Sequence, residues 1–318
     1  MEGKSHTVAS RGLVGSTFTG YNPPRRHGDQ GDYHKMGLQH PAVTRIHACS
    51  HAKLNLFLHV TGQRPDGYHT LQTVFQLLDW GDDMTFELRE HPGITLSGGT
   101  DDLPPEDNLI MKAARAPNQP ERGAHIHITK RIPRGGGLGG GSSNAATTLR
   151  ALNTLWSLNL DQPALLALAK PLGADVPVFT LGQSAWAEGI GEDLSPLALP
   201  PRWYAVIIPA CGVQTAEIFG HPELTRNTAP ITVAAFFSGA GHNDLQPVAM
   251  ALYPEILKAW KWLEARSPSA RMTGSGACLF AAFDTEAEAR SLVARAPAGV
   301  TAVAAQGLDR LPAMQRVE

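Results

Sequence analysis

The chain has 318 residues, 42% of them hydrophobic and 18% charged, which is typical of a globular protein with a sizeable core and room for two domains. Its 27 Lys and Arg nearly balance its 29 Asp and Glu, so the formal net charge of -2 argues against a broad nucleic-acid-binding surface and requires any anion site to be local. No apolar run approaches the roughly twenty residues that span a bilayer, so we expect no membrane partner, and three widely spaced cysteines without a C-x-x-C motif predict reduced thiols in a cytoplasmic protein.

Residues 1–45 are rich in Gly, His, Arg and Asp and show no hydrophobic periodicity, so we expect a disordered extension. They lack the apolar core of a signal peptide. Met36 stands shortly before the first expected strand and is an alternative start of translation.

The first expected strand begins near Ile46, and polar and apolar residues alternate between Lys53 and Val60. Because side chains alternate between the two faces of a strand, this pattern predicts one face that carries Lys53, Asn55, Phe57 and His59. A turn-rich loop at residues 62–69 follows, and residues 71–80 and 84–88 have the composition of strands.

The run from Pro133 to Thr148 contains six glycines in the seven positions 135–141. Alternation at residues 124–132 predicts a strand before it, and apolar spacing predicts a helix after it that ends near Leu158. Backbone amides at such a helix N-terminus favour phosphate, and glycine lets the anion approach without a Cβ in the way. We expect Ser142 and Ser143 to cap the helix or to offer hydroxyl groups to a phosphate or a metal.

A second helix, capped by Asp161, is expected to stop at Gly173, with Asp175 just beyond it. Because Pro177 disfavours helical geometry at the residue before it, we expect Asp175 at a helix-to-strand junction. A Gly- and Pro-rich change of composition at residues 189–201 suggests a boundary between domains at 46–193 and 194–318.

In the second half, residues 203–208 are an expected strand and residues 243–265 a helical stretch. Residues 271–283 form a strand interrupted by Thr273-Gly274-Ser275-Gly276, and residues 285–288 form a capping box that opens another helix. Strands and helices thus occur in both halves, which indicates an α/β or α+β fold.

The glycine run alone leaves other interpretations open. Gly135, Gly137 and Gly140 fit G-x-G-x-x-G, but Asp161, the acidic residue about twenty positions on, is better explained as a helix cap than as the end of a second strand. No lysine completes a Walker motif, and a flexible linker would lack the flanking strand and helix. His125 and His127 share a strand face, yet no further ligand completes a metal site, so we expect none.

Three separated motifs resemble the GHMP kinases, the superfamily of galactokinase and of homoserine, mevalonate and phosphomevalonate kinases. They are Ala-Lys-Leu-Asn-Leu at 52–56, the glycine run, and Thr-Gly-Ser-Gly-Ala-Cys at 273–278. Arg-Pro-Asp-Gly-Tyr-His at 64–69 and Gly-Ala-Asp-Val-Pro at 173–177 make the resemblance closest to the branch that phosphorylates the 2-hydroxyl of a methylerythritol carrying a cytidine diphosphate group, in non-mevalonate isoprenoid synthesis. The resemblance covers residues 46–308 and implies a two-domain α+β fold with the active site in the inter-domain cleft.

The resemblance also implies roles for individual residues. Asp175 matches the base, and Lys53 would orient the hydroxyl, keep Asp175 ionised and offset charge on the transferring group. Asn55, Tyr68, His69 and Phe219 would bind the substrate, the two aromatic rings of Tyr68 and Phe219 by stacking on cytosine. ATP, with Mg²⁺, would bind at Asn108, Lys130, Pro133, Gly135, Gly136, Gly137, Leu138, Gly139, Gly140, Gly141, Ser142, Ser143, Asn144, Thr215, Gly274, Ser275 and Gly276.

Two alternatives remain beside this interpretation. A GHMP kinase with another small alcohol as substrate would have no use for the Tyr68-His69 pair, and a non-catalytic nucleotide-binding module would be expected to have lost Lys53 or Asp175. The expected partner is therefore a small molecule with a cytidine diphosphate group, and the sequence carries no indication of an oligomeric state.

Overall fold

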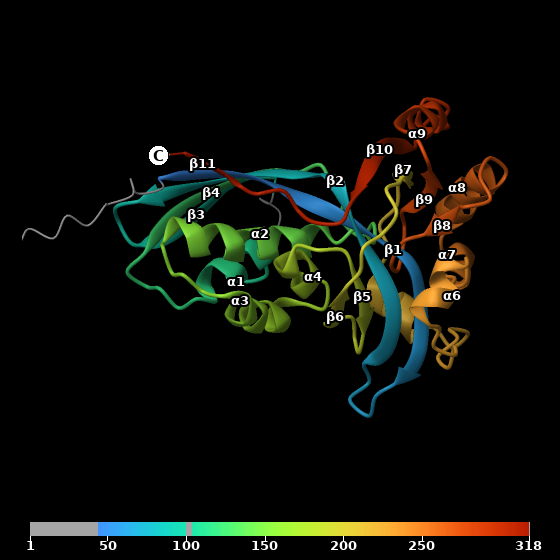
Figure 1. Ribbon diagram of the computed structural model, residues 1–318, viewed down its shortest axis with the longest axis horizontal. Coiled ribbons are helices and arrows are strands. Elements are labelled where there is room, and N and C mark those ends of the chain that lie inside the picture. The colour runs from blue at the N-terminus through green and yellow to red at the C-terminus, as the bar shows by residue number, and fades with distance from the viewer. Residues whose placement is uncertain (1–43, 100–103, 318) are drawn as a thin grey trace, which may run out of the picture. The chain divides into compact units, whose positions relative to one another are not determined.

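Two long antiparallel strands, β1 (Arg45–Gln63) and β2 (His69–Arg89), form the centre of the fold (Figure 1). The computed structural model describes residues 44–99 and 104–317. Residues 1–43 of the expected extension at 1–45, which include Met36, therefore lie outside the described residues. The remaining strands are β3 (Gly93–Gly98), β4 (Gly123–Thr129), β5 (Ala185–Glu188), β6 (Asp193–Pro196), β7 (Trp203–Ile208), β8 (Arg271–Met272), β9 (Leu279–Phe283), β10 (Thr301–Leu308) and β11 (Gln315–Val317).

β2 joins the parts of the sheet because different stretches of it pair with different strands. Residues 83–89 pair with β4, residues 73–75 with β5, and residues 77–78 with β10. The sheet runs in the order β11-β1-β2-β10-β7-β9-β8, and β3, β4, β5 and β6 pair off this path. Among all the strand pairs of the described residues, only β3 and β4 are parallel. A dinucleotide-binding fold is built on a parallel sheet, so the open alternative raised by the G-x-G-x-x-G spacing is excluded.

Helices cover this sheet in two groups (Figure 1). The helices are α1 (Leu109–Arg115), α2 (Gly140–Leu155), α3 (Gln162–Ala169), α4 (Val176–Leu181), α5 (Thr215–Gly220), α6 (Val233–Phe237), α7 (Gln246–Leu252), α8 (Pro254–Glu264) and α9 (Glu286–Val293), with a short 3-10 turn at Lys170–Leu172. Within the described residues, no helix has the length and apolar character needed to cross a membrane.

The two groups of helices enclose separate hydrophobic clusters. One cluster packs α1 and α2 against β1, β2 and β4, where Trp156 also donates from Nε1 to the carbonyl of Gly123 at 3.2 Å. Another cluster packs α5, α7, α8 and α9 against β7, β9 and residues Leu58 and Val60 of β1. The α+β expectation is confirmed, and β1 and β2 connect both clusters.

A β-bulge corrects the expected faces of β1. Lys53 and Asn55 do share a face, as predicted, but the pairing register with β2 shifts between Asn55 and Leu58. One extra residue on a strand reverses the alternation beyond it, so Leu58, opposite Thr73, joins the face of Lys53 and Asn55. The prediction that Phe57 and His59 lie on that face was wrong.

Three local predictions also differ from the structure: the strand after Asp175, the capping role that was one alternative for Ser142 and Ser143, and the end of the helix after the glycine run. Asp175 lies at the start of α4, not before a strand, because Pro177 occupies one of the first helical positions, where its missing N–H costs no hydrogen bond. Helix α2 begins at Gly140, so Ser142 and Ser143 lie inside its first turn, and the N-cap is Gly139 in a left-handed conformation without a side-chain cap. It ends at Leu155, three residues before the expected Leu158.

Candidate active site

A cavity of about 1140 Å³ gathers the motifs that the sequence singled out. Nearly every expected site residue lines it; they are Lys53, Asn55, Tyr68, His69, Asn108, Lys130, Pro133, Gly135 to Ser142, Asn144, Asp175, Thr215, Phe219, Gly274 and Ser275. Ser143 and Gly276 do not line it. Ser143 is instead 1% exposed and accepts a hydrogen bond from Ser50 behind the loop.

The glycine loop lies directly against the loop between β8 and β9. Gly137 has φ +75°, and a Cβ placed on it would lie 2.2 Å from the carbonyl oxygen of Thr273. The amides of Ala277 and Cys278 donate to the carbonyls of Gly135 and Gly136 at 3.1 Å each. Glycine is therefore required here for close backbone approach as well as for its positive φ, and the two motifs form one continuous wall of the cavity.

Lys53 and Asp175 meet in this cavity. Lys53 is 3% exposed, its Nζ donates to Asn55 Oδ1 at 2.6 Å, and it lies 3.2 Å from Asp175 Oδ2. The same ammonium lies 5.4 Å from the centroid of the Phe75 ring. Strand β1 fixes the lysine while the start of α4 supplies the carboxylate, so a buried cation and a one-third exposed anion face each other.

The carboxylate of Asp175 is not used to cap its helix. Asp161 and Asp175 both occupy N-cap positions, of α3 and α4. Asp161 accepts from the amide of Ala164 at 3.0 Å, as a helix cap does. Asp175 makes no side-chain cap bond and faces Lys53, so the cap interpretation explains Asp161 and not Asp175.

Asn55 is held by residues from three strands or loops. Its backbone N–H donates to Thr273 Oγ1 at 2.8 Å, and its side-chain Nδ2 donates to Thr73 Oγ1 at 2.9 Å. Its remaining side-chain atom, Oδ1, accepts from Lys53. Thr73 was not found from the sequence, although it has the same strand parity as Phe75 on β2.

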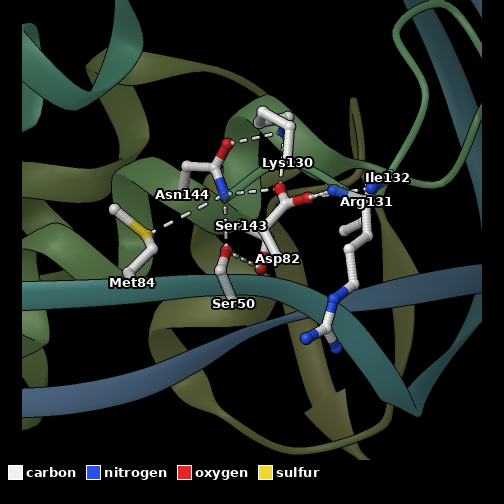
Figure 2. Close-up of polar contacts among 8 residues, drawn as sticks. All are labelled: Ser50, Asp82, Met84, Lys130, Arg131, Ile132, Ser143 and Asn144. Carbon is white, nitrogen blue, oxygen red and sulfur yellow. Dashed lines mark hydrogen bonds and ion pairs between the residues drawn. The ribbon is translucent and has the colours of Figure 1, made fainter. Parts of the chain in front are cut away.

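A buried carboxylate, Asp82 of β2, anchors the entrance to the glycine loop (Figure 2). Asp82 is fully buried, and its Oδ1 accepts from the backbone amides of Arg131 and Ile132 at 2.6 and 2.8 Å. Its Oδ2 accepts from the ammonium of Lys130 and from Asn144 Nδ2. Three donors from residues 130–132, just before the glycine loop, and one from α2 thus converge on the Asp82 side chain. This role of Asp82 was not found from the sequence.

Lys130 and Asn144 are therefore fixed by each other as well as by Asp82. Lys130 Nζ donates to Asn144 Oδ1 at 3.0 Å, and both line the cavity. Asn108 caps α1 by accepting from the Ile110 amide at 2.9 Å. These contacts place the polar side chains expected near ATP in a preformed arrangement.

Part of the cavity lining carries aromatic side chains. Tyr68 is 62% exposed, and the rings of His69 and Phe219 have centroids 5.1 Å apart. Thr215, at the start of α5, shares a hydrogen bond of 2.9 Å with Ser275. The pKa of His69 is lowered by burial and further by the nearby guanidinium of Arg226, which sequence reasoning also missed. An exposed ring beside a neutral imidazole suits a planar, uncharged base.

His125 and His127 lie on the sheet, away from the lining of this cavity. Both bond the Ser97 hydroxyl, at 3.1 and 2.9 Å, and His125 also bonds Thr95. Strand-to-strand hydrogen bonding explains their shared face.

Comparison with known proteins gives a consistent result. Residues 108–183 match the model of the GHMP kinases N terminal domain, and residues 230–300 match that of the GHMP kinases C terminal. The chain is 53% identical over 266 residues to 4-diphosphocytidyl-2-C-methyl-D-erythritol kinase from Nitrosospira multiformis, covering 82% of this chain and 90% of that one. It is 50% identical to the protein of the same name from Alkalilimnicola ehrlichii, covering 81% and 89%.

Solved structures show the same relation. A crystal structure of 4-(cytidine 5'-diphospho)-2C-methyl-D-erythritol kinase superposes with a TM-score of 0.71 at 35% identity, covering 82% of this chain and 98% of that one. Homoserine kinase from Cytophaga hutchinsonii superposes with a TM-score of 0.60 at 18% identity, covering 87% and 98%, which is a likeness of fold.

Proposed function

The chain belongs to the 4-diphosphocytidyl-2-C-methyl-D-erythritol kinase family of the GHMP kinases, and from that premise we propose that it transfers the γ-phosphoryl group of ATP to the 2-hydroxyl of 4-diphosphocytidyl-2-C-methyl-D-erythritol. It is a small-molecule kinase of non-mevalonate isoprenoid precursor synthesis. The observation that carries the proposal for its site is the 3.2 Å contact between Lys53 Nζ and Asp175 Oδ2 in a cavity bordered by the glycine loop.

Asp175 is the proposed general base. An alcohol is a weak nucleophile at neutral pH, and a carboxylate within hydrogen-bond reach accepts its proton as the bond to phosphorus forms. The ammonium of Lys53 faces this carboxylate at 3.2 Å. Asn55, which binds Lys53, holds that ammonium toward the carboxylate.

The glycine loop and the start of α2 are the proposed phosphate site. Backbone amides at a helix N-terminus favour phosphate oxygens, and the loop has no side chain between its backbone and the cavity at positions 135–137 and 139–141. We place the nucleotide beside Asn108, Lys130 and Asn144. When bound, ATP supplies the phosphoryl group.

Mg²⁺ is proposed to accompany ATP. Within residues 44–99 and 104–317 no group of three or more His, Cys, Asp or Glu could hold a metal ion. This fits Mg²⁺, which protein sites commonly bind through one or two carboxylates together with substrate phosphates and water. Asp175 and Asp107 are two of the carboxylates that line the cavity.

The part of the cavity lined by Tyr68, His69 and Phe219 is proposed to bind the cytosine base. Tyr68 and Phe219 would stack on its two faces, and stacking is tolerant of base identity. Hydrogen bonds from His69 would then supply the choice of base.

We also propose that the chain has two domains, 46–193 and 194–318. We propose a cytoplasmic location as well, which the three free cysteines favour.

Asp175→Asn and Lys53→Met test the proposal in an ADP-release assay with Mg²⁺ and ATP. The acceptor substrates are 4-diphosphocytidyl-2-C-methyl-D-erythritol, mevalonate, homoserine and galactose. We expect turnover with the cytidylyl substrate alone and a fall in kcat of about 10²- to 10⁴-fold in Asp175→Asn. Asp161→Asn is the matched control, because it changes an N-cap carboxylate outside the cavity into another good cap.

Each other outcome has a distinct meaning. Turnover with another alcohol would make the chain a GHMP kinase of different specificity. Near wild-type turnover in folded Asp175→Asn would remove Asp175 as the base. Absence of turnover with all four acceptors would favour a nucleotide-binding module without activity.

A further inference from the structure

Thr73 of β2 is buried beside the proposed catalytic pair, and its hydroxyl takes part in two hydrogen bonds. The residue is 1% exposed and lines the cavity. Its Oγ1 donates to the carbonyl of Phe57 at 2.5 Å and accepts from Asn55 Nδ2 at 2.9 Å. Phe57 lies within the bulge of β1, where the ladder is locally disrupted. The Thr73 hydroxyl therefore connects a carbonyl of the bulge to the side chain of Asn55.

The direction of these hydrogen bonds follows from the chemistry of the groups. A carbonyl oxygen can only accept, so the single hydroxyl proton of Thr73 is directed to Phe57. The Thr73 oxygen is then left as an acceptor, and it binds the NH₂ end of the Asn55 side chain. The ammonium of Lys53 has donors and no acceptor, and it meets the oxygen end of the same side chain at 2.6 Å.

Both ends of the Asn55 side-chain amide are thus engaged, and both partners require the same orientation. A half-turn of the amide would bring its NH₂ group against the Lys53 ammonium and its oxygen against the Thr73 oxygen, whose proton is already used. The backbone N–H of Asn55 is held as well, because it donates to Thr273 Oγ1 at 2.8 Å. A fixed Asn55 oxygen in turn holds the ammonium of Lys53, which lies 3.2 Å from Asp175 Oδ2.

We infer that Thr73 is a positioning residue for phosphoryl transfer: by holding the Asn55 amide with its oxygen toward Lys53, it keeps the Lys53 ammonium against Asp175. The inference rests on the proposed function, because it concerns the alignment of that catalytic pair. Thr73 acts through Asn55, and misplacement of a reacting group by about 1 Å can cost about 100-fold in rate. The bulge of β1 has a role in this arrangement, since it contains the carbonyl that takes the Thr73 proton.

The test compares wild type with Thr73→Val, which keeps a β-branched side chain of nearly the same shape and removes the hydroxyl. ADP release is measured with Mg²⁺, ATP and 4-diphosphocytidyl-2-C-methyl-D-erythritol. We expect kcat to fall by about 10- to 100-fold while the KM for ATP stays unchanged, and we expect Thr73→Ser, which keeps the hydroxyl, to recover most of kcat. Thr180→Val is the matched control and should keep the wild-type kcat. Thr180 is also 1% exposed and donates its hydroxyl to a backbone carbonyl, that of Val176 at 2.9 Å, but it does not line the cavity.

A double-mutant cycle with Asn55→Ala separates positioning from a general structural effect. If Thr73 acts through Asn55, Thr73→Val should lower kcat in the wild-type background and cause little further loss in the Asn55→Ala background. Equal losses in the two backgrounds would overturn the inference. So would a Thr73→Ser variant as impaired as Thr73→Val, or equal kcat values for Thr73→Val and Thr180→Val.

Crystal structures of wild type and Thr73→Val give a readout that does not depend on turnover. In the variant, the Lys53 ammonium should move away from Asp175, and an unchanged contact between them would contradict the positioning role. If wild type turns over no acceptor, the proposed function fails, and the two crystal structures still decide whether Thr73 positions Lys53. If Thr73→Val does not fold, Thr73→Ala, which also lacks the hydroxyl, takes its place in both measurements.

Discussion

Substitution of Asp82 by Asn removes one charge from a fully buried site with almost no change of shape. The carboxylate accepts two backbone amides on Oδ1 and two side-chain donors, from Lys130 and Asn144, on Oδ2. An asparagine has one oxygen and one NH₂ group. In either orientation its NH₂ therefore faces two donors, so two hydrogen bonds are lost and Lys130 loses its counter-charge.

The magnitude follows from burial. Breaking a buried ion pair by removing one partner costs about 3–5 kcal/mol, a large part of the roughly 5–15 kcal/mol that keeps a protein folded. Asp83 is the matched control, because it is the next residue along β2 and pairs with the Arg131 side chain where both are about half exposed. A surface pair of that kind contributes about 0–1 kcal/mol.

Urea unfolding followed by tryptophan fluorescence, together with the KM for ATP, measures the difference. Asp82→Asn should lower the unfolding midpoint by about 1 M or more and raise the KM for ATP, because the loop entrance and Lys130 lose their anchor. Asp83→Asn should leave both close to wild type. Equal midpoints and equal KM values for the two variants would refute the reasoning that Asp82 anchors the loop.

Three further predictions follow from other parts of the described chain. Gly137→Ala should lower kcat/KM by about 100-fold, because the new Cβ would meet the carbonyl of Thr273. Gly299→Ala is the control, since Gly299 also has a positive φ but has open space around it, and this variant should keep its activity. Equal kinetics for the two variants would contradict the close-approach argument. Burial is the main cause that lowers the pKa values of His51 and His59 in the folded protein. Both histidines are neutral in the folded and unfolded states well above pH 6.5, so stability is lost as the pH falls below 6.5 toward the lower folded-state pKa values. Urea unfolding midpoints should therefore decline from pH 7.5 to 6.5 to 5.5, and should decline less in His59→Gln. Burial raises the pKa of the Cys278 thiol, and it is the main cause that raises the pKa of Cys49 to about 11. Iodoacetamide at pH 8 should therefore modify these two thiols slowly in the native protein and completely in urea, which mass spectrometry measures. Rapid labelling of Cys278 in the native protein would contradict its burial.

Local sequence signals predicted local structure well. The strand at residues 203–208 is β7 with the same bounds, and the capping box formed by Thr285 and Glu288 opens α9 as predicted. The strand, glycine loop and helix around residues 124–155 follow in the expected order. Each of these features depends on residues within a few positions of one another, so its determinants are visible in the sequence.

The bulge in β1 could not be predicted in the same way. Alternation along residues 53–60 is regular, and the break arises from the register with β2, where Asn55 is opposite Phe75 and Leu58 is opposite Thr73. Register depends on both strands, so one strand's pattern predicts the faces only up to the bulge.

Asp82 and Arg226 were missed because their partners are distant in sequence. Asp82 bonds Asn144, 62 residues away, and Arg226 bonds His69, 157 residues away. For Asp82 one signal existed: it shares strand parity with the apolar Met84 and Phe86, which places a carboxylate on a buried face. Arg226 lies in a loop without periodicity, so no comparable pattern pointed to it.

The two cavity lysines differ in the anions that face them. Lys130 faces Asp82, which is fully buried and already accepts four donors, so its charge is permanently compensated. Lys53 faces Asp175, whose carboxylate is one-third exposed to the cavity and makes no cap bond. In the proposed mechanism Asp175 becomes neutral when it takes the substrate proton, and the positive charge of Lys53 is then uncompensated at the moment when negative charge is transferred beside it. In that mechanism Lys53 is the lysine whose field rises during the reaction, while Lys130 keeps a constant field and a fixed position.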